Sequence, residues 1–389
     1  MIIAYITNNY EPIISGITIS INSYVESLRE IGHEVYVIAP NYPKYYDIKS
    51  YVFRTHSLAV YYKEKYPISV ATSFSIKKLL RNLSIELVHS HHPFGLGETT
   101  LRAVRSTLRL PIVFTYHTNY EDYSHYVPLP NLQYLKKYIS TRAIAYANSS
   151  DLVICPSEFI KEKLSLSGCI ARMKVLPSPI SRHLCNDISD NDCLEKQKKL
   201  NIPQGKFIFL CVTRLAPEKN TDFLLRAYAL FVKNNDNSTL IIAGDGPLKD
   251  YLKVLAFRLN ISEYVVFAGM ESHFNLSLLY SLSNALLFCS KTETQGMPLA
   301  ESLFFSLPVV AVESPAANEF IKKYECGITT ENNEKAFAFG MAKIFTNGSA
   351  ERRTKMNANK LTLKYNEKVL ADRLGRLYVN TINSFDALR

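Results

Sequence analysis

Two glutamates, Glu293 and Glu301, lie eight positions apart in a segment that is typical of a strand end, a loop and a helix start. The helix is expected to begin near Met297, which places Glu293 on the loop and Glu301 about one turn into the helix. Amides at a helix N-terminus bind anions, and a nearby carboxylate can accept hydrogen bonds from the hydroxyls of a ribose or a sugar. An ordinary helix cap, in which the helix dipole favours acidic side chains, is the alternative.

Two cations occupy a comparable position earlier in the same half of the chain. Arg214 and Lys219 follow the strand expected at 207–212 and precede the helix expected at 221–232. Cations at the carboxyl end of a strand can neutralise a diphosphate, and an arginine can form two parallel hydrogen bonds with it. A capped helix with surface charges would explain the same two residues, so both interpretations stay open.

Two glycines mark turns where a ligand could approach the backbone. Gly16 lies in a strand-to-helix loop with little side-chain bulk, and Gly244 opens the tight turn 244–247 after the strand expected at 240–243. Glycine permits close backbone approach at such turns. The second turn is equally consistent with an ordinary connection into a helix.

Four histidines lie near strand ends in the first half. His117 ends the strand expected at 112–116 and can either face a ligand or belong to the core. His89, His91 and His92 straddle another strand end, but no carboxylate stands at ligand spacing from them. We therefore predict no metal site.

Apolar runs alternate with helical patterns along the chain, which is typical of parallel sheets covered by helices. The runs lie at 2–7, 35–39, 85–89, 112–116, 152–155 and 174–176, and then at 207–212, 240–243, 265–267, 285–288 and 309–312. The predicted fold class is α/β, with two Rossmann-like domains whose parallel sheets face a central crevice. Ligands of such folds bind at the carboxyl ends of the strands.

We place the first domain at 1–180 and the second at 206–365. A linker is expected at 181–205, because this segment is polar and ends in a cluster of turn-forming residues. It contains Asp190-Asn191-Asp192, which has the Asp-x-Asp form used by metal-dependent sugar transferases but lacks a preceding apolar strand. The last segment, 366–389, is expected to form a helix that can pack back on the first domain.

The composition is that of a globular protein, with 47% hydrophobic and 21% charged residues, which argues against disorder as the main state. The longest uncharged stretch, 275–290, is rich in serine and asparagine and indicates a buried helix followed by a strand, not a membrane span. The N-terminus lacks the cationic lead of a signal peptide. The seven cysteines form no C-x-x-C pair, so a reducing cytoplasm is expected.

The chain is basic, with 45 Lys+Arg against 35 Asp+Glu and a net charge of +10. Basic residues bunch on helices expected in the first half, including Lys136 and Lys137. Solvated helix faces would account for them, as would an anionic partner such as a lipid surface, a phosphorylated substrate or nucleic acid. The chain has no nucleic-acid recognition module and no basic tail, so no nucleic-acid partner is expected.

The order of these motifs resembles that of the retaining glycosyltransferases of family 4, which have the GT-B fold. The resemblance rests on the Gly16 loop, Tyr116-His117-Thr118, Arg214-x4-Lys219, the turn 244–247 and Glu293-x7-Glu301. Segments 11–16, 91–97 and 116–123 are similar to those of the bacterial diacylglycerol glucosyltransferases. The chain departs from the family pattern at Pro177-Ser178-Pro179-Ile180-Ser181, where Pro-Thr-Gly-Ile-Asp is usual, and at Ser306, where glycine often stands.

The resemblance implies a role for each motif. Arg214 and Lys219 would bind the donor diphosphate, Glu301 the ribose, and Glu293 the transferred sugar. The backbone of Gln295, Gly296 and Met297 would lie beside the phosphates, His117 would line the reacting sugar, and Gly16 and Gly244 would belong to the donor site. The implied catalytic set is His117, Glu293, Arg214 and Lys219.

The implied activity is retaining, metal-independent transfer of a hexose, from UDP-glucose to a membrane lipid such as diacylglycerol, without a cofactor. The alternatives are a soluble sugar or metabolite as the acceptor, or an inactive nucleotide-sugar-binding protein. The oligomeric state is left open by the sequence.

A lipid acceptor would require contact with the membrane. We expect a cytoplasmic protein that docks peripherally on the anionic inner face of the membrane. Tyr120, Tyr123, Tyr126, Lys136 and Lys137 are the expected acceptor or membrane contacts. Tyrosine suits the headgroup zone, and each lysine near such a surface contributes about 1 kcal/mol.

Overall fold

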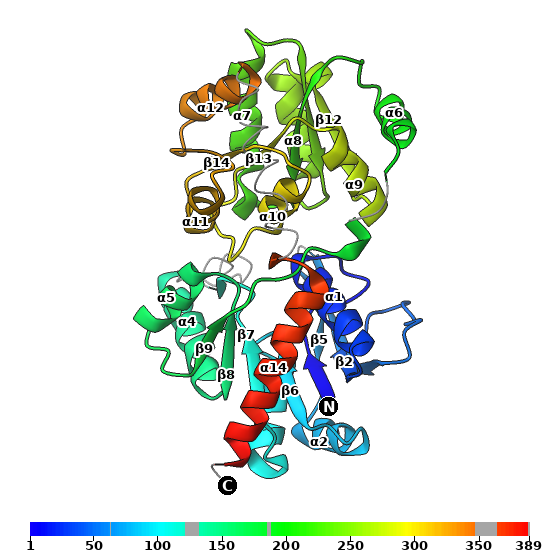
Figure 1. Ribbon diagram of the computed structural model, residues 1–389, viewed down its shortest axis with the longest axis vertical. Helices are drawn as coiled ribbons and strands as arrows, with labels where there is room; N and C mark the ends of the chain where they lie inside the picture. Colours follow the sequence, from blue (N-terminus) through cyan, green and yellow to red (C-terminus); the bar gives the residue numbers. More distant parts are fainter. Residues whose placement is uncertain (63, 121–131, 185–187, 347–363, 388–389) are drawn as a thin grey trace. The chain divides into compact units, whose positions relative to one another are not determined.

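The chain divides into two compact units, of which one is discontinuous in sequence. The first unit comprises Met1–Pro179 together with Glu367–Arg389, and the second comprises Ile180–Asn366. The computed structural model describes all residues except 63, 121–131, 185–187, 347–363 and 388–389 (Figure 1). Each unit has its own parallel sheet with helices packed against it, as the alternation of apolar runs and helical patterns predicts.

In the described part of the first unit, seven strands form one parallel sheet in the order β3-β2-β1-β6-β7-β8-β9. Their bounds are β1 Ile2–Ile6, β2 Glu34–Pro40, β3 Val52–Thr55, β6 Leu87–Ser90, β7 Ile112–Thr115, β8 Leu152–Cys155 and β9 Met173–Val175. Strands β6, β7 and β8 are buried along their whole length, because helices cover both faces of the sheet. The antiparallel hairpin of β4 (Ser57–Tyr62) and β5 (Glu64–Ser69) is an addition that the sequence analysis did not anticipate.

The helices of the first unit are α1 Gly16–Glu30, α2 Ser73–Asn82, α3 Leu96–Ala103, α4 Leu132–Asn148, α5 Glu158–Leu166 and α14 Glu367–Asp386, and a π-helical segment, Val104–Leu108, continues α3. The hydroxyl of Ser15 caps α1 by accepting a hydrogen bond from the amide of Thr18. Helix α14, red in Figure 1, packs beside α1 and completes the hydrophobic core of this unit with Leu370, Leu374 and Tyr378.

In the described part of the second unit, six strands form a parallel sheet in the order β12-β11-β10-β13-β14-β15. Their bounds are β10 Phe207–Val212, β11 Ser238–Ala243, β12 Val265–Gly269, β13 Ala285–Phe288, β14 Val309–Val312 and β15 Gly327–Thr330. The helices are α6 Asp190–Lys199, α7 Thr221–Val232, α8 Lys249–Arg258, α9 His273–Leu282, α10 Met297–Phe304, α11 Pro315–Tyr324 and α12 Glu334–Thr346.

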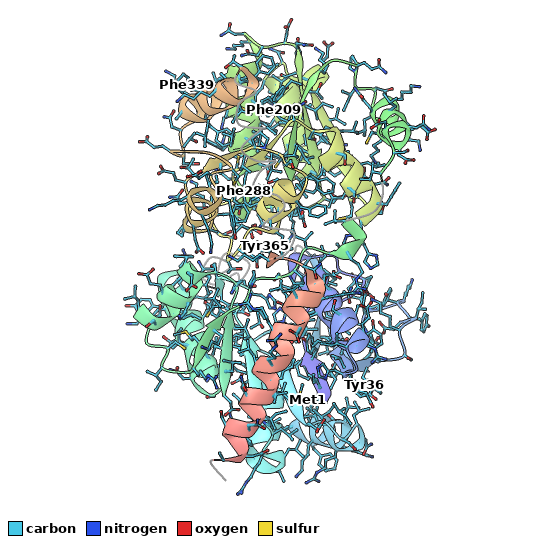
Figure 2. The ribbon with its side chains drawn as sticks, in the orientation of Figure 1. Met1, Tyr36, Phe209, Phe288, Phe339 and Tyr365 are labelled. Atoms are coloured by element: carbon cyan, nitrogen blue, oxygen red, sulfur yellow. The ribbon has the colours of Figure 1, made fainter. Side chains whose placement is uncertain are left out.

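The second sheet has a hydrophobic layer on each face. Phe209 belongs to the layer formed with α7 and α12, and Phe288 belongs to the layer formed with α9, α10 and α11 (Figure 2). The uncharged stretch 275–290 forms most of α9 and all of β13, which confirms the predicted helix and strand.

The linker predicted at 181–205 is wrong, because this segment is part of the second unit and contains helix α6. A capping box starts the helix, in which Ser189 and Asp192 each accept a hydrogen bond from the other residue's amide. Lys196 then anchors α6 through an ion pair of 2.7 Å with Glu271, in which both side chains are only 10% exposed. The Asp-x-Asp sequence is therefore a helix cap.

Each sheet has a topological switch point at its first strand. Strand β1 lies between β2 and β6, and β10 lies between β11 and β13. In each sheet the strands that follow the first one in sequence are added on one of its sides, and the later strands are added on the other side. Such points are where open α/β sheets bind ligands. The loops that carry the candidate residues follow β1 and β7 in the first unit and β10, β11 and β13 in the second.

Candidate active site

Lys219 and Glu293 form an ion pair at the switch point of the second sheet. Lys219 ends the short helical turn Pro217–Lys219 after β10, and Glu293 lies in the loop between β13 and α10. Their Nζ and Oε1 atoms are 2.5 Å apart, and the side chains are 12% and 24% exposed. The pair places a positive and a negative group together at this edge of the sheet and leaves both within reach of solvent.

Arg214 is the second cation of the β10 loop. Its Nη1 atom lies 3.9 Å from Oε1 of Glu218, whose side chain is almost fully buried, whereas the Arg214 side chain is 30% exposed. This long ion pair orients the guanidinium without burying it. Asn220 links the β10 loop to the loops after β13 and β15. Its Nδ2 atom donates to the Cys289 carbonyl at 3.4 Å and to Oδ1 of Asn332 at 2.9 Å.

The N-terminus of α10 lies in the same loop as Glu293. Gly296 precedes the helix in the left-handed conformation, with a φ of 75°, which favours glycine. Gly296 has no side chain that could cap the first turn, and Gln295 donates to the Met297 sulfur at 3.5 Å. Pro298 has no N–H and the Leu299 amide donates to the Gly296 carbonyl at 2.9 Å, so the Met297 amide is the first N–H that the helix start offers to an anion.

Glu301 lies one turn into α10 and is buried, with 4% of the residue exposed. The hydroxyl of Tyr280 in α9 donates to its Oε2 atom at 2.6 Å. Burial raises the pKa of Glu301 to about 7, although the Tyr280 hydrogen bond opposes this shift. The carboxyl group is therefore close to half ionised near neutral pH, and a ligand that donates hydrogen bonds to it would favour the ionised form.

The two predicted glycines differ in what surrounds them. A Cβ atom at Gly244, where φ is 136°, would lie 1.9 Å from the carbonyl oxygen of Thr213, so the packing of the two strand ends already requires glycine. Gly16 is the first residue of α1, and no atom lies within 4 Å of the place where its Cβ would be. The space beside Gly16 is open, which is compatible with the approach of a ligand.

His117 follows β7 in the first unit and is paired with His91. Nε2 of His117 lies 2.8 Å from Nδ1 of His91, and the two rings are stacked with their centroids 5.1 Å apart. Desolvation lowers the pKa of His117 to about 3 and that of His91 well below its ordinary value. Both imidazoles are therefore neutral at pH 7.

The other two histidines of this region have partners of their own. His89 bonds to the Tyr378 hydroxyl at 2.6 Å and to the Thr115 hydroxyl at 2.7 Å. His92 accepts a hydrogen bond of 3.2 Å from the amide of Asn8. Within the described residues, no three His, Cys, Asp or Glu side chains are arranged to hold a metal ion.

Two family models match the chain, one on each side of the boundary between the units. The model for group 1 glycosyl transferases matches residues 193–361, and that for glycosyltransferase family 4 matches residues 14–183. The chain is a glycosyltransferase with a family 4 domain followed by a group 1 domain. The predicted GT-B class, with two Rossmann-like parallel-sheet domains, is confirmed.

This glycosyltransferase is similar to curated proteins along its length. It is 29% identical to the alpha-monoglucosyldiacylglycerol synthase of Acholeplasma laidlawii, with 98% of each chain covered. The Streptococcus pneumoniae protein of the same name is also 29% identical, with 82% of this chain and 73% of that protein covered. Among solved structures, Anabaena Alr3699/HepE in complex with UDP and glucose matches with a TM-score of 0.77 at 16% identity, covering 98% of this chain and 100% of that one.

The residues predicted to contact the acceptor or the membrane differ in their exposure to solvent in the glycosyltransferase. Tyr120 is buried, and its ring packs edge-on against Phe94 and Tyr116, so the prediction that it faces lipid is wrong. Tyr123 and Tyr126 lie outside the described residues. Lys136 and Lys137 are exposed on α4, between Tyr134 and Tyr138, which are 75% and 62% exposed.

No helix in the described chain of the glycosyltransferase combines the length and the apolar character needed to span a bilayer.

The two departures from the family pattern have structural explanations. Ser306 adopts the left-handed conformation with a φ of 61°, so the serine keeps the backbone that glycine usually provides at this turn. Segment 177–181 contains the boundary between the units, which falls after Pro179. Its first part is held by hydrogen bonds from Tyr24 to the Pro177 carbonyl and from Ser20 to Ser178.

Several polar groups beside the predicted residues were not predicted from the sequence. Tyr280, the partner of Glu301, lies in a helix that no motif marks. Ser290 and Thr292 precede Glu293, and their buried hydroxyls have no hydrogen-bond partner among the described residues. Their position in the same loop as Glu293 was the available signal, since small hydroxyl side chains there can donate to an anion.

Proposed function

We propose that the protein is a retaining, metal-independent glucosyltransferase that transfers glucose from UDP-glucose to diacylglycerol at an anionic membrane surface. The observation that carries the proposal is the Lys219–Glu293 pair beside the uncapped start of α10, in a chain that is similar along its length to alpha-monoglucosyldiacylglycerol synthases. The solved structure with UDP and glucose shares the fold and supports this choice of donor.

The donor would be bound by charge and by hydrogen bonds from the second unit. Arg214, Lys219 and the Met297 amide at the start of α10 are suited to a diphosphate, because they offer positive charge and N–H donors without a metal ion. Gly244 and the backbone of Gln295 and Met297 belong to the same strand edge. Glu301 is suited to accept hydrogen bonds from the ribose hydroxyls, and Glu293 from the hydroxyls of the sugar.

The reaction would replace one bond at the anomeric carbon. The bond to the diphosphate oxygen breaks while the acceptor hydroxyl oxygen bonds to the same carbon, and the hydroxyl proton leaves with the departing diphosphate. Attack from the side of the leaving group gives retention without a protein nucleophile, as the family resemblance implies. Arg214 and Lys219 stabilise the negative charge that develops on the diphosphate, and neutral His117 contributes a hydrogen bond to the sugar.

The acceptor side of the proposal rests on the first unit. The exposed start of α4 combines two tyrosines with Lys136 and Lys137, a combination suited to the headgroup zone of an anionic membrane. The names of the two curated relatives support diacylglycerol as the acceptor. Under this proposal the protein is peripheral and acts at the cytoplasmic face of the membrane.

A transfer assay tests the proposal. The protein is incubated with UDP-glucose and vesicles that contain diacylglycerol and an anionic phospholipid, and the products are separated and identified by mass and by the NMR coupling of the anomeric proton. An α-linked glucosyl-diacylglycerol is expected. Transfer to glucose or another soluble sugar while diacylglycerol stays unmodified would contradict the lipid acceptor, and a β-linked product would contradict retention.

A further inference from the structure

The pairing of His117 with His91 determines which ring nitrogen of His117 carries the proton. Both rings are neutral, so each carries one proton, and only one of the two facing nitrogens can donate across the 2.8 Å contact. If His117 donated from Nε2, the proton of His91 would lie on its own Nε2 atom. That atom is buried and has no hydrogen-bond partner among the described residues.

A buried N–H group without an acceptor is rarer and more costly than a lone pair without a donor. The favoured arrangement therefore has His91 donating from Nδ1 to the lone pair on Nε2 of His117. His117 must then carry its own proton on Nδ1. In this tautomer Nδ1 of His117 is a hydrogen-bond donor, whereas in the other tautomer it would be an acceptor.

His91 is itself held by residues that are distant in sequence. Its ring packs against that of His89 with the centroids 4.3 Å apart. His89 is fixed at both nitrogens, by the hydroxyl of Thr115 in β7 and by that of Tyr378 in α14. Tyr378 is fully buried and also bonds to the Tyr5 hydroxyl at 2.8 Å. Helix α14 is thus linked, through Tyr378 and His89, to the pair formed by His91 and His117.

We propose that His91 is a positioning residue that holds His117 in the Nδ1–H tautomer, and that Tyr378 of α14 supports this arrangement through His89. The proposal deepens the proposed function, because it takes His117 as a residue that contacts the transferred sugar. It gives the first histidine of the segment 91–97 a role that is neither metal binding nor simple core packing.

Three substitutions of His91 separate its hydrogen bond from its volume. His91→Phe keeps a flat ring but cannot donate to His117. His91→Asn places an amide N–H close to the position of Nδ1, whereas His91→Gln places it close to that of Nε2. His91 and His117 line a small cavity together with Ser20 and Ser178.

We expect His91→Phe to lower kcat for glucose transfer from UDP-glucose about 10- to 100-fold with little change in KM, since the donor is still bound but His117 is misoriented. His91→Asn should recover most of the lost kcat and His91→Gln should not. Tyr378→Phe should lower kcat by a smaller factor. Tyr228→Phe is its matched control, because it removes an equally buried hydroxyl, bonded to Ser238 in the second unit.

NMR of protein labelled with ¹⁵N-histidine provides a readout that does not require activity. Long-range ¹H–¹⁵N correlations report the tautomer of each ring, and His117→Gln assigns the signal. The wild type should show His117 as a single Nδ1–H tautomer, and His91→Phe should show a mixture. A wild-type His117 protonated at Nε2, or equal kcat for the Asn and Gln variants, would overturn the proposal.

The two arms keep this proposal separate from the proposed function. If no nucleotide sugar is turned over, the proposed function fails while the tautomer measurement still decides the role of His91. If His91→Phe does not fold, the wild-type spectrum and the comparison of His91→Asn with His91→Gln decide it.

Discussion

Nζ of Lys219 and Oε1 of Glu293 are 2.5 Å apart, although 74 residues separate them in the sequence. The contact joins the loops after β10 and β13, which are neighbours in the sheet. Under the proposed function, a diphosphate that binds to Lys219 would compete with the carboxylate, and Glu293 would then be released toward the sugar. The ion pair would keep both groups in place before the donor arrives.

The pair should show strong coupling in a double-mutant cycle. Lys219→Ala should lower kcat/KM by about 2–4 kcal/mol of transition-state stabilisation, roughly 30- to 1000-fold, because it removes a cation from a partly desolvated site. Glu293→Gln should also lower it, and the double variant should lose less than the sum of both. Additive losses would show that the contact has no role in catalysis.

Arg214 should matter as much as Lys219, for the same electrostatic reason. Arg214→Ala is expected to lower kcat/KM about 30- to 1000-fold. Arg226→Ala is the control, since Arg226 forms ion pairs with Asp222 and Glu334 on the surface of the same unit and should change kcat/KM less than threefold. If Arg214→Ala and Lys219→Ala both keep wild-type turnover in folded protein, the diphosphate assignment is wrong.

Transfer should continue after metal ions are removed. The cations of the β10 loop and the amides of α10 already provide positive charge at the leaving group, and the only Asp-x-Asp sequence caps α6. The rate with excess EDTA should equal the untreated rate. Loss of transfer on chelation, with recovery on addition of magnesium or manganese, would contradict the metal-independent mechanism.

Glu301 should lower the free energy of unfolding as the pH rises, whereas most carboxylates lower it as the pH falls. Burial raises its pKa from an ordinary value of 4.5 to about 7 in the folded protein, so the unfolded chain binds fewer protons between these values. Stability contributed by this group is therefore present below pH 4.5 and lost as the pH rises to 7. At pH 8 the ionisation of the buried Glu301 lowers the free energy of unfolding by about 3 kcal/mol.

Glu301→Gln should remove this cost. Its thermal unfolding midpoint relative to wild type should be several degrees higher at pH 8 than at pH 5, with the exposed substitution Glu331→Gln as a control that shows no such difference. Equal effects of Glu301→Gln at the two pH values would mean that the carboxyl group titrates normally.

Membrane binding should depend on the exposed start of α4. The protein should float with vesicles that contain anionic lipid and not with neutral vesicles, and high salt should weaken the association. The double variant with Lys136→Glu and Lys137→Glu should bind less. Lys198→Glu with Lys199→Glu makes the same charge change on exposed residues of α6 and should bind like wild type. Negligible flotation of the wild type under all conditions would argue against the membrane proposal.

The sheets could be predicted because their strands are continuous apolar runs. A strand that is buried on both faces needs no polar residues, so β8, β13 and β14 stand out from the sequence. Because parallel strands place their carboxyl ends at one edge, the loops after β10 and β13 could be expected to meet there, and the Lys219–Glu293 contact lies at this edge.

Helix α6 and the partners of the site residues could not be predicted in the same way. Helix α6 has almost no apolar face, and a capping box and the Lys196–Glu271 ion pair hold it instead. Tyr280 reaches Glu301 from the preceding helix, α9, and Tyr378 reaches His89 from α14, at the other end of the sequence. Tyr120 is buried by aromatic neighbours, although a loop rich in tyrosine suggests exposure. Such contacts depend on tertiary packing, which spacing does not encode.

The position of α14 has a consequence for the order of folding during synthesis. Its side chains fill the core of the first unit, but they leave the ribosome only after the whole of the second unit has been made. The second unit is continuous in sequence and can complete its sheet and core earlier. The first unit is translated first but therefore reaches its final packing last. Until α14 has been made, the apolar side chains of α1 that it covers stay accessible to chaperones.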